Sequence, residues 1–246
     1  LHELGRFDEA IRSYQNALDI VPNYAQAHSN LGDSLQALGR PNEALVCYDR
    51  ALSLSPHYVE AHSNKGNALF CLKRTAEAIT SYEQAITLNP QYAEAHYNLG
   101  NAWLKLGKAD KALICFDRAL EIRPLHADTF CNKSEAWRDL GRSDRALQSS
   151  DRAIELDPMH AKAYVNRGNA LRDMGLSELS LQSYQRALEL EPTMQEACWN
   201  LGLHWLIHQR WDQGWRNYFA RRSLDGAASI SWHPGVLRWE GGRPQG

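Results

Sequence analysis

The sequence predicts an all-α fold, a right-handed α-solenoid of tandem 34-residue helix-turn-helix units. Two columns of residues carry this prediction. Proline recurs at intervals of 34, at Pro22, Pro56, Pro90, Pro124, Pro158 and Pro192. Glycine recurs in the same frame, at Gly5, Gly39, Gly107, Gly141 and Gly175. A fixed period of this length is typical of stacked helical repeats and not of a single globule.

Each unit is numbered here from slot 1, and the units start at Ala25, Val59, Ala93, Ala127, Ala161 and Gln195. Slots 4, 7, 8 and 11 lie on one side of a helix at about 100° per residue, which predicts a first helix, A. The glycine at slot 15 is a suitable left-handed stop for it, with Lys73 and Gln209 as exceptions. A second periodic stretch predicts helix B, which ends before the slot-32 proline because the residue preceding proline resists helical geometry.

The frame divides the chain into five full units, at 25–58, 59–92, 93–126, 127–160 and 161–194. A partial unit at 1–24, mainly helix B, precedes them. A degenerate unit or cap at 195–222 and a Trp-, Gly- and Pro-containing tail at 223–246 follow. Because the chain begins inside a unit and without Met, we expect it to be part of a longer protein. Ile11, Tyr14 and Leu18 are then expected to be exposed.

Slot 8 holds a residue that disfavours a helix. It contains Gly32, Gly66, Gly100, Ser134, Gly168 and Gly202. A glycine inside a helix is about 1 kcal/mol less favourable than alanine. Its recurrence therefore predicts a close approach of helix B, with the bulky slot-24 column as the partner.

These residues together resemble the tetratricopeptide repeat. The shared pattern is an aromatic or similar residue at slot 4, Leu-Gly at 7–8, Gly at 15, Ala at 20, an aromatic at 24, Ala at 27 and Pro at 32, and it covers residues 1 to about 222. The resemblance implies a protein-protein interaction module whose A helices line a concave groove.

Slot 6 is asparagine in every unit, at Asn30, Asn64, Asn98, Asn132, Asn166 and Asn200, and slot 9 adds Asn67, Asn101 and Asn169. A carboxamide offers two donors and an acceptor without charge, which suits the main chain of an extended peptide. A similar asparagine ladder occurs in the repeat arm of O-GlcNAc transferases. We expect this ladder to bind a peptide, although an amide that only meets solvent remains an alternative. Other candidate groove residues are Tyr97, Lys105, Arg138, Lys162 and Arg172.

Some members of the resembled family hold a partner's C-terminus in a clamp with lysine at slot 5 and arginine at slot 6. Neither occurs in this sequence, and only Lys162 matches the family's slot-2 lysine. Capture of an acidic chaperone tail is therefore not expected.

Composition excludes other classes of function. A net charge of −2 favours neither nucleic acid nor a membrane surface, and no apolar run approaches a membrane span. Five scattered cysteines without a CxxC pair favour a reducing, cytoplasmic location. We expect no enzyme activity, cofactor or metal in this chain: His204 and His208 lack a third ligand, and Cys47 and Cys115 are expected to be packed thiols. His28, His62 and His96 occupy the core-facing slot 4.

Two alternatives concern the ends of the chain. The runs WDQGWRNYFAR (211–221) and RWEGGRPQG (238–246) are similar to the junction of bacterial tetratricopeptide proteins that carry a glycosyltransferase-like domain. The chain would then be the substrate-recognition arm of an enzyme whose catalytic domain follows residue 246. The second alternative is self-assembly through the partial first unit or the aromatic C-terminal end, where Trp232, Val236, Leu237 and Trp239 could also fold back onto the groove.

Overall fold

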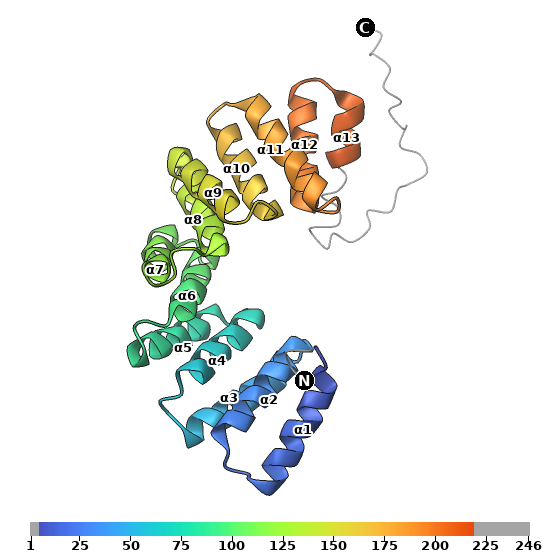
Figure 1. Cartoon of the computed structure of the whole chain (residues 1–246). Helices are drawn as coiled ribbons and strands as arrows, with labels where there is room; N and C mark the ends of the chain where they lie inside the picture. The colour runs from blue at the N-terminus through green and yellow to red at the C-terminus, as the bar shows by residue number, and fades with distance from the viewer. Residues whose placement is uncertain (1–4, 219–246) are drawn as a thin grey trace. The chain divides into compact units, whose positions relative to one another are not determined.

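The computed structural model describes residues 5–218, and this part of the chain is all-helical, without strands (Figure 1). The helices are α1 (Phe7–Ile20), α2 (Ala25–Ala37), α3 (Pro41–Leu54), α4 (Val59–Cys71), α5 (Thr75–Leu88), α6 (Ala93–Lys105), α7 (Ala109–Ile122), α8 (Ala127–Asp139), α9 (Ser143–Leu156), α10 (Ala161–Asp173), α11 (Ser177–Leu190), α12 (Gln195–Ile207) and α13 (Trp211–Tyr218). The predicted class of tandem helix pairs is confirmed. The predicted tail at 223–246, its fold-back and the RWEGGRPQG run lie outside the described residues.

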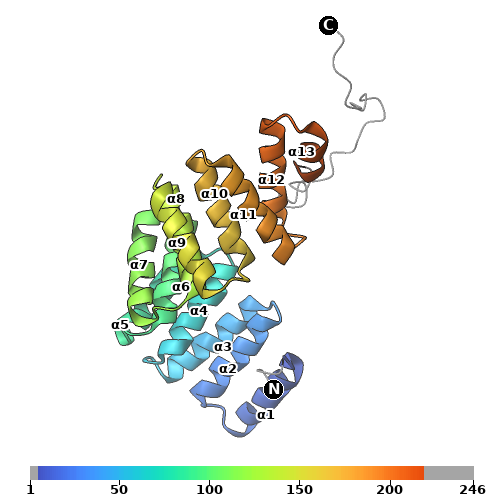
Figure 2. The same ribbon diagram turned by 45° about the horizontal axis from the view of Figure 1, so that its top comes forward.

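The described residues form two compact units that divide between Thr129 and Phe130, inside α8. In the first unit, α2 packs on α3, α4 on α5 and α6 on α7, and the B helices α3 and α5 also contact the A helix that follows them (Figure 2). The A helices α2, α4 and α6 contact one another in order. In the second unit the same succession runs from α9 to α13.

The A helices end in left-handed residues, as the glycine column predicts. Five slot-15 glycines have φ between 69° and 78°, and the two exceptions, Lys73 and Gln209, adopt the same conformation at 61° and 59°. At the end of α2 the N–H of Gly39 donates to the carbonyl of Gln36 and the N–H of Arg40 to that of Leu35. These bonds satisfy carbonyls that a helix end would otherwise leave without partners.

Slot 8 is glycine because helix B leaves no room for a side chain. A Cβ on Gly66 would lie 2.5 Å from Cε1 of Tyr82, and one on Gly100 would lie 2.5 Å from Cε1 of Phe116. The same contact recurs for Gly32 with Tyr48 and for Gly168 with Tyr184. The predicted contact between slots 8 and 24 is confirmed.

The unit at 127–160 changes both partners of this contact at once. It has Ser134 at slot 8 and Ser150 at slot 24, and both are buried. With no ring to clash, the Ser134 side chain fits, and its hydroxyl donates to the carbonyl of Ala146 at 2.8 Å. The paired exchange follows from one steric rule: a side chain at slot 8 requires a small residue at slot 24.

The apolar residues of α1 are more buried than the sequence analysis predicted. Ile11 is buried, and Tyr14 and Leu18 are partly buried against the core that includes Leu31 and Leu35 of α2. The prediction of exposure at Ile11 is wrong because the A helix of the next unit covers this side of α1. The exposed apolar residues lie instead at the end of α1 and after it, at Ile20, Val21 and Tyr24.

The last helix, α13, covers part of the apolar surface of α12. A Cβ on Gly214 would lie 2.6 Å from Cδ2 of Leu206, so Gly214 marks a close approach of the two helices. Leu206 is half-buried, whereas Ile207 remains 72% exposed. Within residues 5–218 no helix combines the length and the apolar character that crossing a membrane requires.

Candidate functional site

The slot-6 asparagines join successive A helices. The Nδ2 of Asn98 on α6 donates to Oδ1 of Asn67 on α4 at 3.0 Å. In the second unit, Asn200 of α12 donates to Asn169 of α10 at 3.0 Å. Asn64 makes the corresponding bond to a carboxylate oxygen of Asp33 at 2.7 Å. Each bond runs from slot 6 of one repeat to slot 9 of the repeat before it.

The slot-9 oxygen accepts a second bond from helix B of its own repeat. The hydroxyl of Tyr82 donates to Asn67 Oδ1 at 2.8 Å, and Tyr184 donates to Asn169 Oδ1 at 2.8 Å. Tyr48 donates to Asp33 at 2.8 Å, and burial, reinforced by this carboxylate, raises the pKa of the Tyr48 hydroxyl. One oxygen thus ties together three helices. The recurrence of asparagine therefore has a structural reason that does not depend on a ligand.

The ladder divides by exposure. Asn166, Asn169 and Asn200 are buried, with 7%, 2% and 3% of their surface accessible, and Asn166 donates to the carbonyl of Cys131 at 2.9 Å. These three side chains lack the accessibility that a groove-lining ladder requires. The remaining ladder residues are half-buried: Asn30, Asn64, Asn67, Asn98, Asn101 and Asn132.

The charged candidates lie in different environments. Lys162 forms an ion pair with Glu135 at 3.3 Å. Arg172 donates to Asn200 Oδ1 at 3.1 Å and pairs with Asp173 at 3.3 Å, so it supports the ladder in the second unit. Lys105 is exposed at the end of α6, and Arg138 is half-buried on α8.

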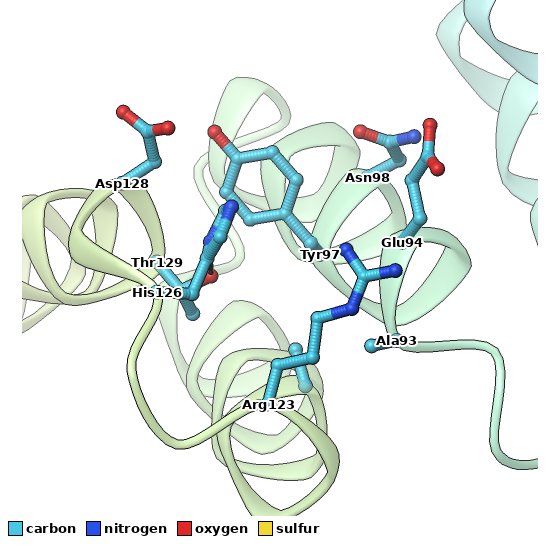
Figure 3. A pocket seen from close by; sticks show the side chains of 9 residues that line it. Ala93, Glu94, Tyr97, Asn98, Arg123, His126, Asp128 and Thr129 are labelled. Carbon is cyan, nitrogen blue, oxygen red and sulfur yellow. Dashed lines mark hydrogen bonds between the residues drawn. The ribbon is translucent and has the colours of Figure 1, made fainter.

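A cavity of 210 Å³ opens in the first unit where α6, α7 and the first turn of α8 meet (Figure 3). Tyr97 stands beside it, and its ring meets the His126 ring edge-on with centroids 5.3 Å apart. The residues lining the cavity are Ala93, Glu94, Tyr97, Asn98, Ala119, Arg123, His126, Asp128 and Thr129.

An exchange of residue size accounts for this cavity. In the two preceding joints, slot 5 is serine and slot 34 is tyrosine, as in Ser63 with Tyr92. Here slot 5 is Tyr97 and slot 34 is His126, whose Nδ1 lies 2.7 Å from Thr129 Oγ1. The imidazole is smaller than a phenol and is held against Thr129. Since Ala93 and Ala119 are also small, the space remains open.

The cavity carries both signs of charge. Arg123 is exposed and forms no ion pair with any described residue. Its guanidinium extends along the same side as Glu94 and Asn98, while the Asp128 carboxylate lies on the opposite rim, beyond the Tyr97 ring (Figure 3). The lining therefore places a cation, two carboxylates, an amide and an aromatic ring around one cavity.

Sequence reasoning found Tyr97 and Asn98 but missed Glu94, Arg123 and His126. A signal for the cavity was present in the Ser-Tyr to Tyr-His exchange between slots 5 and 34. The cavity could be recognised only once slots 5 and 34 of the same unit were known to lie against each other.

The slot-4 histidines have a structural arrangement. The Nε2–H groups of His28, His62 and His96 donate to the carbonyls of Pro22, Pro56 and Pro90 at 2.9, 2.9 and 3.1 Å. The rings of His204 and His208 lie 4.5 Å apart, and no group of three or more potential metal ligands occurs among residues 5–218.

Burial lowers the reactivity of two of the thiols. Burial raises the pKa of both the Cys47 and the Cys115 thiols to about 11. Since the thiolate is the reactive form, neither thiol has the character of a nucleophile near neutral pH.

Comparison with known proteins supports the repeat assignment. A TPR repeat model matches residues 1–39 and 66–107. Models of the tetratricopeptide repeat match 25–58, 93–125, 127–160 and 161–194. No curated protein matches the sequence.

Several solved structures share the fold. The MamA protein has 24% identity and a TM-score of 0.61, covering 69% of this chain and 92% of its own. YrrB, described as a TPR protein with an unusual peptide-binding site, has 24% identity and a TM-score of 0.61, covering 75% and 95%. The Cut9-Hcn1 hetero-tetramer of APC/C gives 14% identity and a TM-score of 0.80, covering 93% of this chain and 45% of the other. With helix pairs, left-handed stops and family models in agreement, the chain belongs to the tetratricopeptide repeat family.

Proposed function

We propose that this chain is a protein-interaction module that binds an extended peptide segment of a partner, with the cavity beside Tyr97 as the subsite for one side chain. Tetratricopeptide repeats are typically non-catalytic interaction modules, and both the peptide-binding site named for YrrB and the Cut9-Hcn1 assembly agree with this class of function. The observation that carries the proposal is the cavity, because the corresponding position in the two preceding joints holds a tyrosine at slot 34.

In this proposal the ladder has two tasks. Asn98 uses one N–H to bond Asn67, and its amide oxygen and second N–H make no further bond within the described residues. The bond to Asn67 fixes the plane of the amide, so a peptide would meet hydrogen-bonding groups that are already oriented. Asn64 has the same arrangement on Asp33. Asn98 and Asn64 would then hold the peptide main chain.

Side-chain selectivity comes from the cavity. A volume of 210 Å³ is below the range of about 300–1,000 Å³ typical of small-molecule pockets, and it suits one side chain better than a whole ligand. The Tyr97 ring offers an aromatic face, and Arg123 offers a fork of donors that can bind a carboxylate in a bidentate manner. We therefore expect bound peptides to place an aromatic or acidic residue here.

The test introduces at slots 5 and 34 of this repeat the residues that the preceding repeats have there. The double variant Tyr97→Ser/His126→Tyr copies the Ser63 and Tyr92 pair, so it should close the cavity while keeping the fold. Peptides selected on the wild-type chain from an unbiased random library would be labelled and titrated by fluorescence anisotropy. We expect the double variant, and Arg123→Ala, each to weaken binding by about tenfold or more, the equivalent of about 1.4 kcal/mol.

Tyr24→Ala is the matched control, because Tyr24 is a half-exposed slot-34 tyrosine away from the cavity. Its affinity for the selected peptides should equal that of the wild type. Helical circular dichroism of all variants must remain unchanged for the comparison to hold. Equal affinity of the wild type and the double variant would show that the cavity is not the subsite.

A further inference from the structure

A second and larger groove lies on the opposite side of α6 from the ladder, between α5 and α7. Its volume is 600 Å³, within the range of typical ligand pockets. Ile86 and Leu99 form part of an apolar lining, and the buried thiol of Cys115 adjoins them. On α7, Ile114 lines the groove and is 70% exposed, as is Val46 at the same slot of α3.

Slot 7 differs between this joint and two others. In the preceding joint, slot 7 is Lys65, whose Nζ reaches Asp49 on the B helix of the repeat before it at 2.7 Å. In the second unit, slot 7 is Arg167, which binds Asp151 of α9 at 2.7 Å and Ser183 of α11 at 2.8 Å. In those joints a long charged side chain crosses between helices.

At the open joint, slot 7 is Leu99 and slot 25 of the repeat before it is Glu83. Leucine is too short and apolar to reach that carboxylate, so no ion pair spans the surface. Leucine at slot 7 follows the repeat pattern, as at Leu31 and Leu201, and here it leaves the groove without a slot-7 ion pair to bridge it.

The rim of the groove is mainly acidic. Glu83 lies on the α5 side and Glu121 on α7, and Asp117, also on α7, has a partner within the described residues. The one guanidinium in the lining, that of Arg118, is paired with Glu121 at 2.6 Å. An apolar floor with a negatively charged rim is complementary to an apolar stripe flanked by positive charges.

We propose that this groove binds an amphipathic helix of a partner protein, with its apolar face against Ile86 and Ile114, over the buried Leu99, and with lysine or arginine residues beside that face. A helix lying in a groove presents residues i, i+3, i+4 and i+7 on one side, which suits an elongated apolar site between two helices. This site is separate from the cavity beside Tyr97, so the proposal does not rest on the peptide subsite.

The probe is a labelled peptide of about 16 residues with leucine at i, i+3, i+4 and i+7 and lysine on the flanking positions, long enough for helix to form on binding. Two companions replace every lysine by glutamate or every leucine by serine. We expect saturable binding of the lysine peptide to the full chain, weakened by salt, and at least about tenfold weaker binding of both companions.

The closing variant is Leu99→Lys, which copies Lys65 and places an ammonium within reach of Glu83. We expect it to weaken binding of the lysine peptide by about tenfold or more. Leu99→Met, which keeps the apolar character and similar volume, should bind as the wild type does. The variant Tyr97→Ser/His126→Tyr should also bind the probe normally.

Absence of saturable binding, equal affinity for the glutamate peptide, or unchanged affinity of Leu99→Lys would each overturn the proposal. Loss of probe binding in Tyr97→Ser/His126→Tyr would place the probe in the other cavity and would overturn it as well. Light scattering of the wild type and Leu99→Lys tests whether the groove is instead occupied by a second copy of this chain. Self-association that Leu99→Lys abolishes would assign the groove to a second copy of this chain instead.

Discussion

The Nδ2 of Asn98 lies 3.0 Å from Oδ1 of Asn67, and this bond joins the A helices of successive repeats. The same oxygen accepts from Tyr82 at 2.8 Å. Asn98, which the sequence pattern places in a ligand-binding row, therefore forms a hydrogen bond between repeats that does not depend on a ligand. A ligand would meet an amide that the fold has already oriented.

This arrangement predicts a graded effect of removing asparagine side chains. Asn98→Ala should lower the free energy of unfolding by about 1 kcal/mol, the typical loss for one hydrogen bond. Asn200→Ala should cost more, about 1–3 kcal/mol, because Asn200 is buried and its loss leaves buried partners unsatisfied. Urea denaturation followed by circular dichroism measures both.

Asn30 is the matched control for these two variants. It occupies the same slot, but its side chain makes no bond within the described residues, where α1 supplies no slot-9 acceptor. Asn30→Ala should change stability by less than about 0.5 kcal/mol. Equal losses for Asn30 and Asn200 would contradict the inter-repeat role.

A second prediction concerns the slot-8 glycines. Helix propensity alone predicts that Gly66→Ala stabilises the chain by about 1 kcal/mol. The structure predicts the opposite sign, because the new Cβ would lie 2.5 Å from the buried Tyr82 ring, whose hydroxyl is bonded to Asn67. Overpacking of this kind costs about 1–3 kcal/mol. Thermal or urea unfolding decides the sign.

A double-mutant cycle tests whether a clash with the Tyr82 ring causes the loss of stability in Gly66→Ala. Tyr82→Ser destabilises the chain on its own, but Gly66→Ala should be far less harmful in that background, as Ser134 and Ser150 illustrate. Additive effects of the two changes would exclude the ring as the source of the clash.

The third prediction is a stabilising change. Lys73 has φ of 61° where other repeats have glycine, and a left-handed conformation costs a residue with a Cβ about 1 kcal/mol or more. Lys73→Gly should therefore raise stability, partly offset by the greater freedom of glycine in the unfolded chain. Gln209→Gly tests the same effect at φ of 59°. A lower melting temperature for both variants would show that the lysine and glutamine make compensating contacts.

The fourth prediction concerns pH. Burial lowers the pKa of His96 below its ordinary value of 6.5, with a further contribution from Arg118, although the bond to Pro90 and the charge of Glu121 oppose the shift. The unfolded chain then binds more protons than the folded chain just below pH 6.5. Stability should therefore rise with pH through this window and fall as the solution is acidified.

His96→Gln removes this titration. The unfolding free energy of the variant should depend less on pH between about 5 and 7 than that of the wild type. Some dependence should remain, because the pKa of His204 is lowered as well, by burial and by His208. Identical slopes for the wild type and the variant would show that His96 does not contribute.

The sequence by itself determined the repeat length, the helix pairs, the left-handed stops and the tight contact between slots 8 and 24. These features are local or recur in most units, so one repeated contact explains a column such as Gly66, Gly100 and Gly168. Only the tertiary structure decided what each polar column does. Asn98 and Asn200 occupy the same slot, yet one is half-buried and the other is buried.

The physical reason is that a side chain's partners come from a neighbouring repeat. The cavity beside Tyr97 depends on His126 at the other end of the same unit and on Thr129 of the next unit, and at the groove between α5 and α7 Leu99 forms no ion pair with Glu83 of the unit before it. Periodicity shows which side of a helix a residue occupies. Burial, hydrogen bonding and open space are set by the size and charge of the residues that the next helix brings against it.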